Sequence, residues 1–123
     1  MTPDELMALW GYHAEAAGLS PRTIRARRVV VGAAARLAGV EVTALAQMDI
    51  VRYLSRDLSP WAKRTYYSHL REWSRWLVAQ GARPDNPTDG LRSPKAPRQY
   101  PRPMSDAQLS QALASAGLGR SPT

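Results

Sequence analysis

Apolar residues in the middle of the chain recur with the spacing of an α-helix rather than a strand. Between residues 59 and 81, four large apolar residues follow one another at steps of four, three and four: Tyr66, Leu70, Trp73 and Leu77. This spacing places them on one face of a helix. Ser59 and Pro60 suit the first positions of that helix, and Gly81 suits its end. The pattern predicts a helix from residue 60 to about residue 80 that buries this face.

A second set of residues on the same predicted helix repeats the same steps and is polar: Arg64, Ser68, Arg71 and Arg75. A helix that buries its apolar stripe leaves such a stripe in solvent. The arginines can then be a solvated basic face, or they can offer guanidinium groups to a polyanion. The helix alone does not decide between these two interpretations.

Three further helices are predicted upstream by the same kind of evidence. Residues 2–17 begin with Thr-Pro and place Leu6, Leu9, Trp10 and His13 on one side. A second helix follows Ser20-Pro21, ends before Gly39, and has a stripe of Ile24, Val31, Ala35 and Ala38. A third helix, about residues 46–56, has Met48, Val51, Tyr53 and Leu54 as packing residues. The fold class predicted is therefore all-α, with four helices in one bundle.

The composition of the sequence changes after Gly81. Six of the ten prolines lie between residues 82 and 103, and proline at this density prevents helix formation and favours an extended, semi-rigid segment. Ser105 then suits the start of a short helix, residues 106–116. We therefore divide the chain into a helical domain (1–82), a basic Pro-rich linker (83–104) and the start of a further domain (105–123).

The charge distribution favours nucleic acid as the partner. The formal net charge is +7 and the isoelectric point about 10.6. Residues 19–40 carry +5, residues 58–84 carry +4 and residues 91–103 carry +4, whereas the remaining residues sum to −6. The first predicted helix contains three acids and no Lys or Arg, so we expect it to face away from the polyanion. Basic excess on two helices and a linker is typical of a surface that follows phosphate groups.

Residue patterns that carry catalysis are not found in the sequence. It contains no cysteine, no Gly-rich phosphate loop and no His-Glu-x-x-His motif. His13 and His69 have no obvious partners, and of the tryptophans we assign Trp73 to the core and Trp61 and Trp76 to its edges. We predict neither a metal site nor a cofactor, and we interpret the chain as a binding module and not an enzyme.

The order of these features resembles one known family. Ser20-Pro21-Arg22-Thr23-Ile24 opens one helix, and Ser59-Pro60 opens another that carries Arg64, Leu70-Arg71, Trp73 and Trp76-Leu77. Gly81, Asn86-Pro87, Pro94-Lys95-Ala96-Pro97 and Pro101-Arg102-Pro103 follow before a helix that Ser105 caps. Over residues 2–116 this series is similar to the N-terminal core-binding domain of tyrosine recombinases, the phage-integrase family.

The resemblance implies an orthogonal, SAM-like helical bundle that binds double-stranded DNA at core recombination sites. In such proteins the second and fourth helices face the major groove, the linker crosses the DNA, and a catalytic domain closes the clamp. The matching positions here are Arg22, Thr23, Arg25, Arg28, Lys63, Arg64, Tyr67, Ser68, Arg71, Lys95 and Arg98. The resemblance also implies other recombinase protomers as partners in the full-length assembly.

Two departures from the family pattern matter. Position 27, often tyrosine in the family, is Arg27 here, and the sequence leaves open whether this residue packs or contacts DNA. The arginine, lysine, His-x-x-Arg and nucleophilic tyrosine that the family uses for cleavage have no counterparts in these residues. The chain by itself is therefore expected to bind DNA without cleaving it.

Two alternatives to DNA binding at recombination sites stay open. The basic faces could dock an acidic protein, or the chain could be a small DNA-binding regulator unrelated to recombination. A helix-turn-helix repressor is disfavoured, because no short pair of helices with a tight turn is evident. We expect a monomeric domain in the cytoplasm of a bacterial cell, and the sequence leaves open whether the bacterium or a phage encodes it.

Overall fold

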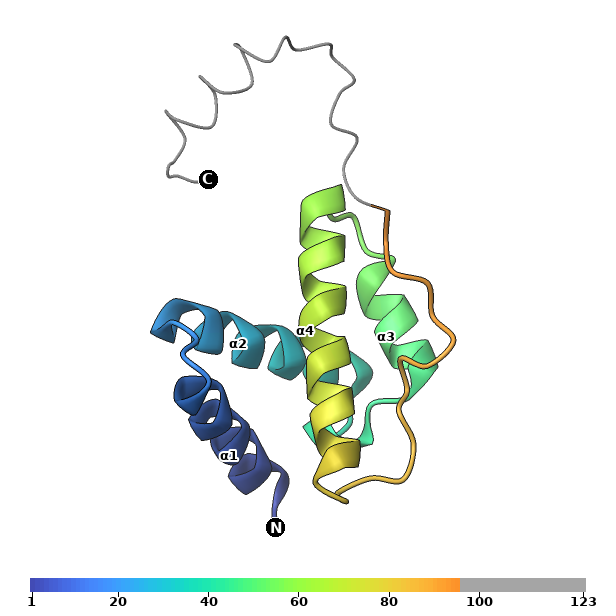
Figure 1. Ribbon diagram of the computed structural model, residues 1–123. Coiled ribbons are helices and arrows are strands. Elements are labelled where there is room, and N and C mark those ends of the chain that lie inside the picture. Colours follow the sequence, from blue (N-terminus) through green and yellow to red (C-terminus); the bar gives the residue numbers. More distant parts are fainter. Residues whose placement is uncertain (96–123) are drawn as a thin grey trace, which may run out of the picture.

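Four α-helices and one short 3₁₀ segment make up the part of the chain that the computed structural model describes, residues 1–95 (Figure 1). The helices are α1 (Pro3–Ala16), α2 (Pro21–Ala38), α3 (Gln47–Leu54) and α4 (Pro60–Ala79), with η1 (Val42–Ala44) between α2 and α3. Residues 1–95 contain no strand, so the predicted all-α class is confirmed. None of the described helices is long and apolar enough to cross a membrane. Arg98, the rest of the predicted linker and the helix predicted at 106–116 lie outside the described residues.

The helix starts follow the capping chemistry of the sequence. The hydroxyl oxygens of Thr2, Ser20 and Ser59 accept hydrogen bonds from the third residue of α1, α2 and α4, at 3.1–3.2 Å. Each of these caps satisfies a backbone N–H that has no partner within its helix. At the other end of α2, Gly39 adopts a left-handed φ of 72°, which glycine does without steric cost. Predicted and observed bounds of α1, α2 and α4 agree within one residue.

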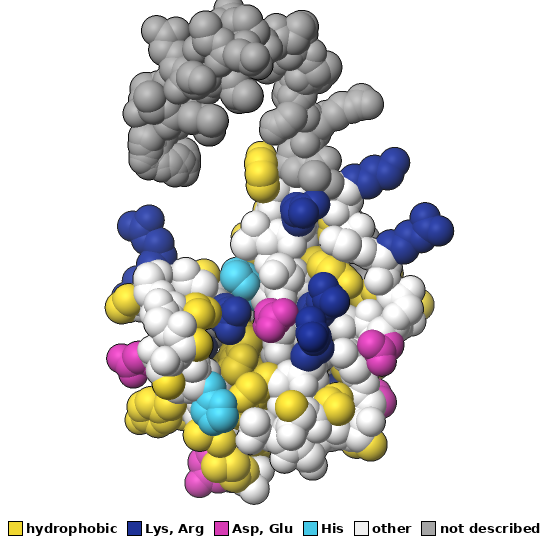
Figure 2. All heavy atoms as spheres, viewed as in Figure 1, with side chains coloured by type: hydrophobic (Ala, Val, Ile, Leu, Met, Phe, Trp, Pro, Cys, Tyr) yellow, Lys and Arg dark blue, Asp and Glu magenta, His cyan; other side chains and the backbone are white. Residues whose placement is uncertain are grey.

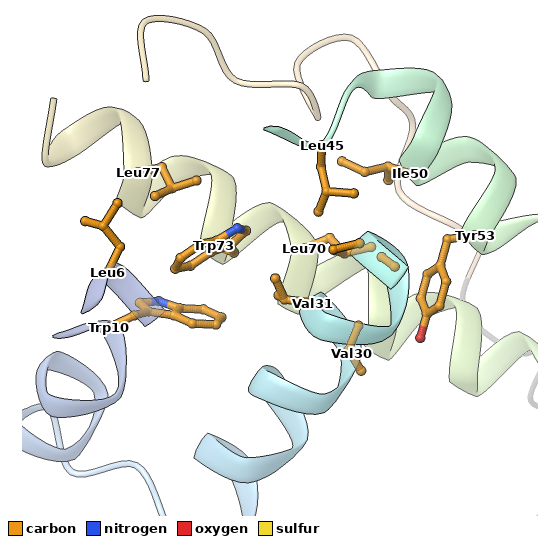
Figure 3. Close-up of a cluster of buried hydrophobic side chains, with 12 residues drawn as sticks. Leu6, Trp10, Val30, Val31, Leu45, Ile50, Tyr53, Leu70, Trp73 and Leu77 are labelled. Carbon is orange, nitrogen blue, oxygen red and sulfur yellow. The ribbon is translucent and has the colours of Figure 1, made fainter. Parts of the chain in front are cut away.

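The core lies where α2 passes behind α4 and α1 packs below their crossing (Figures 1 and 3). Trp73 is 1% exposed and its ring centroid lies 5.0 Å from that of Trp10, so α4 and α1 meet through two indoles. Trp73 Nε1 donates to the carbonyl of Val42 at 2.9 Å, which ties η1 to α4. Leu70 and Leu77 are also buried, as predicted. The small buried side chains of α2, among them Val31 and Ala34, belong to the same cluster, so the apolar stripe of α4 packs against both α1 and α2.

Several predicted packing residues are wrong in detail. On α2 the buried residues are Val30, Val31, Ala34 and Ala35, whereas Ile24 and Ala38 are only partly buried. On α3, Ile50 is buried with Tyr53, while Met48 and Val51 are exposed. α2 contacts α1, α3 and α4, so its buried surface is wider than a single stripe. A pattern of one face per helix underestimates such a central helix.

The described part of the predicted linker, residues 83–95, begins against the bundle. The Arg83 guanidinium donates to the carbonyls of Thr43 and Leu45, at 3.1 and 2.8 Å, and to the carboxylate of Asp85. Gln47 Nε2 donates to the carbonyls of Pro87 and Asp89. These hydrogen bonds span about 40 residues of sequence, so they fasten the chain beyond α4 to the start of α3.

Candidate nucleic-acid interface

The solvent face of α4 carries the basic stripe that the sequence predicts. Arg64, Ser68, Arg71 and Arg75 are all exposed, because the opposite side of the helix is held by Leu70, Trp73 and Leu77. Figure 2 shows Lys and Arg side chains gathered over α4 and at the free end of α2. We call the exposed side chains of Arg64, Ser68, Arg71 and Arg75 the α4 basic face.

The N-terminal half of α2 adds a second group of cations. Arg22, Arg25 and Arg28 are exposed, and Thr23 is half-buried, with its hydroxyl accepting a hydrogen bond from Ser20 at 3.1 Å. Arg25 and Arg28 line a surface pocket of about 340 Å³ on the side of α2 that faces α1. The Arg28 guanidinium lies over Gly11 of α1, where even a Cβ atom would collide with it. Arg22 and Arg25 are thus exposed, Arg25 beside this pocket, whereas the Arg28 guanidinium packs on α1.

Three titratable side chains lie where α2 and α4 cross: Arg27, His69 and Glu72. The Arg27 guanidinium carbon lies 5.2 Å from the centre of a Trp10 ring, and its Nε is buried without a hydrogen-bond partner. Burial, and secondarily the charge of Arg27, lowers the pKa of His69 below its usual value. Glu72 lines the same pocket as Arg27 and lies 3.8 Å from Arg75. The sequence left open whether Arg27 packs on the core or contacts DNA. In the unbound domain it packs on Trp10.

Lys63 and Tyr67 lie on a different flank of α4 from the basic face. Both line a shallow pocket with Leu91, Arg92 and Pro94. Tyr67 is only 7% exposed and its hydroxyl donates to the Leu91 carbonyl at 3.5 Å. Tyr67 therefore packs against the chain after Gly90, and its contact with DNA stays a prediction. Lys95 is exposed beyond this flank.

Most of the cations have no acidic partner in the described part of the chain. Residues 1–95 contain two ion pairs, Arg75 with Glu72 at 3.8 Å and Arg83 with Asp85 at 3.0 Å. The hydrogen bond from Arg83 is the main reason that the pKa of Asp85 is lowered. Arg64, Arg71, Arg22 and Arg25 are in neither pair. Guanidinium groups that are exposed and unneutralised are suited to phosphate oxygens, which they can bind with two parallel hydrogen bonds.

Sequence reasoning misplaced one residue of this surface, Trp61. It was expected at the edge of the core, but it is 60% exposed. Its spacing gives the signal that was missed, since Arg64, Thr65 and Ser68 follow it at three, four and seven residues. Trp61 thus lies on the same side of the helix as the α4 basic face, and not on the stripe of Leu70 and Trp73.

His13 also differs from expectation, because it has a partner. Its Nδ1 accepts a hydrogen bond from Trp76 Nε1 at 3.3 Å, and the two rings meet edge to face at 5.5 Å. This pair joins α1 to α4 and explains the histidine structurally. Within residues 1–95, no group of three or more His, Cys, Asp or Glu side chains could hold a metal ion.

Fold and surface together define a small all-helical domain with exposed arginines on two crossing helices. No family model matches the sequence. The chain is 37% identical over 59 residues to the tyrosine recombinase XerC of Salmonella typhi, a match that covers 48% of this chain and 20% of that protein. Its structure is similar to the integrase from mycobacterium phage Brujita, with a TM-score of 0.74 and 34% identity over 89% of this chain. The chain is thus related to the N-terminal region of the tyrosine recombinase and phage integrase family.

Both matches cover only part of the related proteins. The match covers about a fifth of the length of XerC and 39% of the length of the Brujita integrase. The likeness extends over nearly the whole of this chain in the structural comparison and about half of it in the sequence comparison. The relationship therefore concerns one region of these proteins and not their whole length.

Proposed function

We propose that this chain binds double-stranded DNA at recombination sites, as the N-terminal part of a tyrosine recombinase that forms one side of a clamp. The observation that carries the proposal is the α4 basic face, which holds three exposed arginines. Arg64 and Arg71 are in no ion pair within residues 1–95. Relatedness to a recombinase and an integrase supports DNA as the polyanion.

The proposed contact surface combines the α4 basic face with the N-terminal half of α2. The two helices cross, and their N-terminal halves extend away from the crossing in different directions (Figure 1). Arg22 and Arg25 on one helix and Arg64 and Arg71 on the other can then reach phosphates on both sides of a groove. Ser68, between them, is short enough to let the α4 backbone approach base edges.

The DNA-binding role does not require any group in residues 1–95 to break a bond. Neither histidine is placed for such chemistry, since His13 bonds Trp76 and His69 is half-buried beside Arg27. We propose that cleavage and strand exchange belong to other parts of the full protein and to its neighbouring protomers. Residues 1–95 position the DNA.

The test is a fluorescence-anisotropy titration of a labelled duplex half-site, and of a scrambled duplex of equal length, with the purified chain. We expect Arg64→Ala and Arg71→Ala each to weaken binding roughly tenfold, since a hydrogen bond to a charged group contributes about 1.5 kcal/mol. The matched control is Arg52→Ala, which removes an exposed arginine from α3 and should leave the affinity unchanged.

Equal losses in all three variants would contradict the proposed surface, because they would indicate a general effect of net charge. Failure of the unaltered chain to bind duplex at low salt would contradict DNA binding itself and favour an acidic protein as partner. Tighter binding to the half-site than to the scrambled duplex would show that bases are read as well as phosphates.

A further inference from the structure

Trp61 differs from the other three tryptophans of the chain. Trp10 and Trp73 are buried against one another, and Trp76 stacks on Trp73 with ring centroids 5.7 Å apart. Trp61 is 60% exposed and, within residues 1–95, takes part in no aromatic pair or cation–π contact. Trp61 belongs neither to the core cluster nor to the partly buried residues packed against it.

The position of Trp61 is fixed by the start of α4. Ser59 caps the helix with a hydrogen bond to the Ala62 N–H at 3.1 Å, and Pro60 occupies the first helical position. Trp61 therefore belongs to the rigid first turn rather than to a loop. One turn later on the same side come Arg64 and Thr65, and a further turn on comes Ser68.

We propose that Trp61 is a DNA-contacting residue whose indole covers a deoxyribose of the sugar–phosphate backbone beside the phosphates held by Arg64. This inference rests on the proposed function and adds to it an apolar contact that charge alone does not reveal. The ring offers a large, rigid apolar surface, and its Nε1–H is a donor for a phosphate oxygen. Arg64, one turn away, favours duplex DNA over an apolar partner, since an apolar protein surface would have to desolvate its guanidinium.

An apolar contact and a phosphate contact respond differently to salt. Neutralising a phosphate releases counterions. Removing such a contact therefore makes the slope of log K against log salt less negative by about one. Burial of apolar surface releases no counterions. Trp61→Ala should therefore weaken duplex binding roughly fivefold at every salt concentration, whereas Arg64→Ala should change the slope.

The experiment compares the unaltered chain with Trp61→Ala, Trp61→Phe and Met48→Ala in duplex titrations at three or more salt concentrations. Met48 is the matched control, because it is 56% exposed and lies on α3. We expect Met48→Ala to bind as the unaltered chain does, and Trp61→Phe, which keeps a ring but loses the N–H, to fall between the unaltered chain and Trp61→Ala.

Acrylamide quenching gives a readout that is independent of affinity. The difference in quenching between the unaltered chain and Trp61→Phe reports on Trp61, and saturating duplex should reduce it. Duplex binding with no shielding of Trp61 and no loss in Trp61→Ala would overturn this inference while leaving the proposed function intact. Loss of self-association in Trp61→Ala, measured by sedimentation, with unchanged DNA affinity would overturn it in favour of a second copy of the chain. Absence of any duplex binding would overturn both proposals.

Discussion

Two groups of arginine have the same chemistry and opposite surroundings. Arg64 and Arg71 extend from α4 into solvent and are in no ion pair within residues 1–95. The side chain of Arg83 is only 13% exposed and donates to two backbone carbonyls and a carboxylate. Arg27 is partly buried, with its guanidinium carbon 5.2 Å from the centre of a Trp10 ring. The first group is available to a partner, and the second holds the fold together.

The comparison shows why net charge overstates the DNA-binding charge of a small domain. Arg27 belongs to the basic stretch of residues 19–40, but it packs on Trp10. Arg83 belongs to the basic stretch of residues 58–84, but it fastens the chain after α4 to the residues before α3. A guanidinium that already satisfies partly buried carbonyls cannot bind a phosphate without giving up those hydrogen bonds. Only the exposed arginines should contribute to the salt dependence of binding.

The largest effect that separates the two groups is expected in stability. Arg83→Ala should lower the free energy of unfolding by about 2–4 kcal/mol, because two carbonyls lose their donor and each unsatisfied group costs about 1–3 kcal/mol. Chemical denaturation followed by circular dichroism measures this change. Arg71→Ala is the matched control and should change the stability by less than about 0.5 kcal/mol. Similar stabilities for the two variants would remove the distinction between the groups.

A smaller effect is expected for Arg27, whose partly buried side chain packs on Trp10. Arg27→Met keeps an unbranched chain, loses a cation–π contact of about 0.5–1 kcal/mol and removes a buried N–H without a partner. These contributions oppose each other, so we expect a change in unfolding free energy below about 1 kcal/mol. The slope of DNA binding against salt should stay the same. A slope of log K against log salt that becomes less negative by about one in Arg27→Met would show that Arg27 binds a phosphate.

The smallest effect concerns His69, beside Arg27. Its pKa is lowered by burial and by Arg27, so the unfolded chain binds a proton more readily than the folded domain does. The contribution of neutral His69 to the free energy of unfolding is therefore fully present above pH 6.5, the ordinary histidine pKa. It is lost as the pH drops through the lowered pKa of the folded state. His69→Gln should remove this dependence between about pH 7 and 5, where few carboxylates titrate. Denaturation series at several pH values measure it, and an identical pH dependence in both proteins would contradict the assignment.

The sequence was sufficient to predict the helices because their signals are local. Ser-Pro pairs start α2 and α4, Gly39 and Gly81 adopt the left-handed φ of helix ends, and the apolar steps of α4 identify Leu70, Trp73 and Leu77. The arrangement of the helices was taken from a family resemblance, since periodicity does not determine how helices cross. Met48 and Val51 were misassigned on α3 for the same reason. A short helix leaves several faces that could equally be buried.

The candidate site was predictable in part. Helical spacing correctly placed Arg64, Ser68 and Arg71 on an exposed face. It could not identify Arg83 as a structural residue, because its partners, Thr43 and Leu45, are about 40 residues away. It also did not reveal the burial of Tyr67, which depends on Leu91 lying against α4. Local patterns thus predict which residues share a helix face, whereas their partners come from tertiary contacts.

The most direct test of DNA binding by the exposed arginines is a heteronuclear NMR titration of the chain with a duplex half-site. We predict that the amide signals of residues 22–28 of α2 and 61–75 of α4 shift with added DNA, while those of α3 and of the first two turns of α1 stay in place. The apparent association constant should fall with salt at a slope near −4 to −5, as expected for about five phosphates. Shifts concentrated on α3, or binding that does not depend on salt, would contradict the assignment of this surface to DNA.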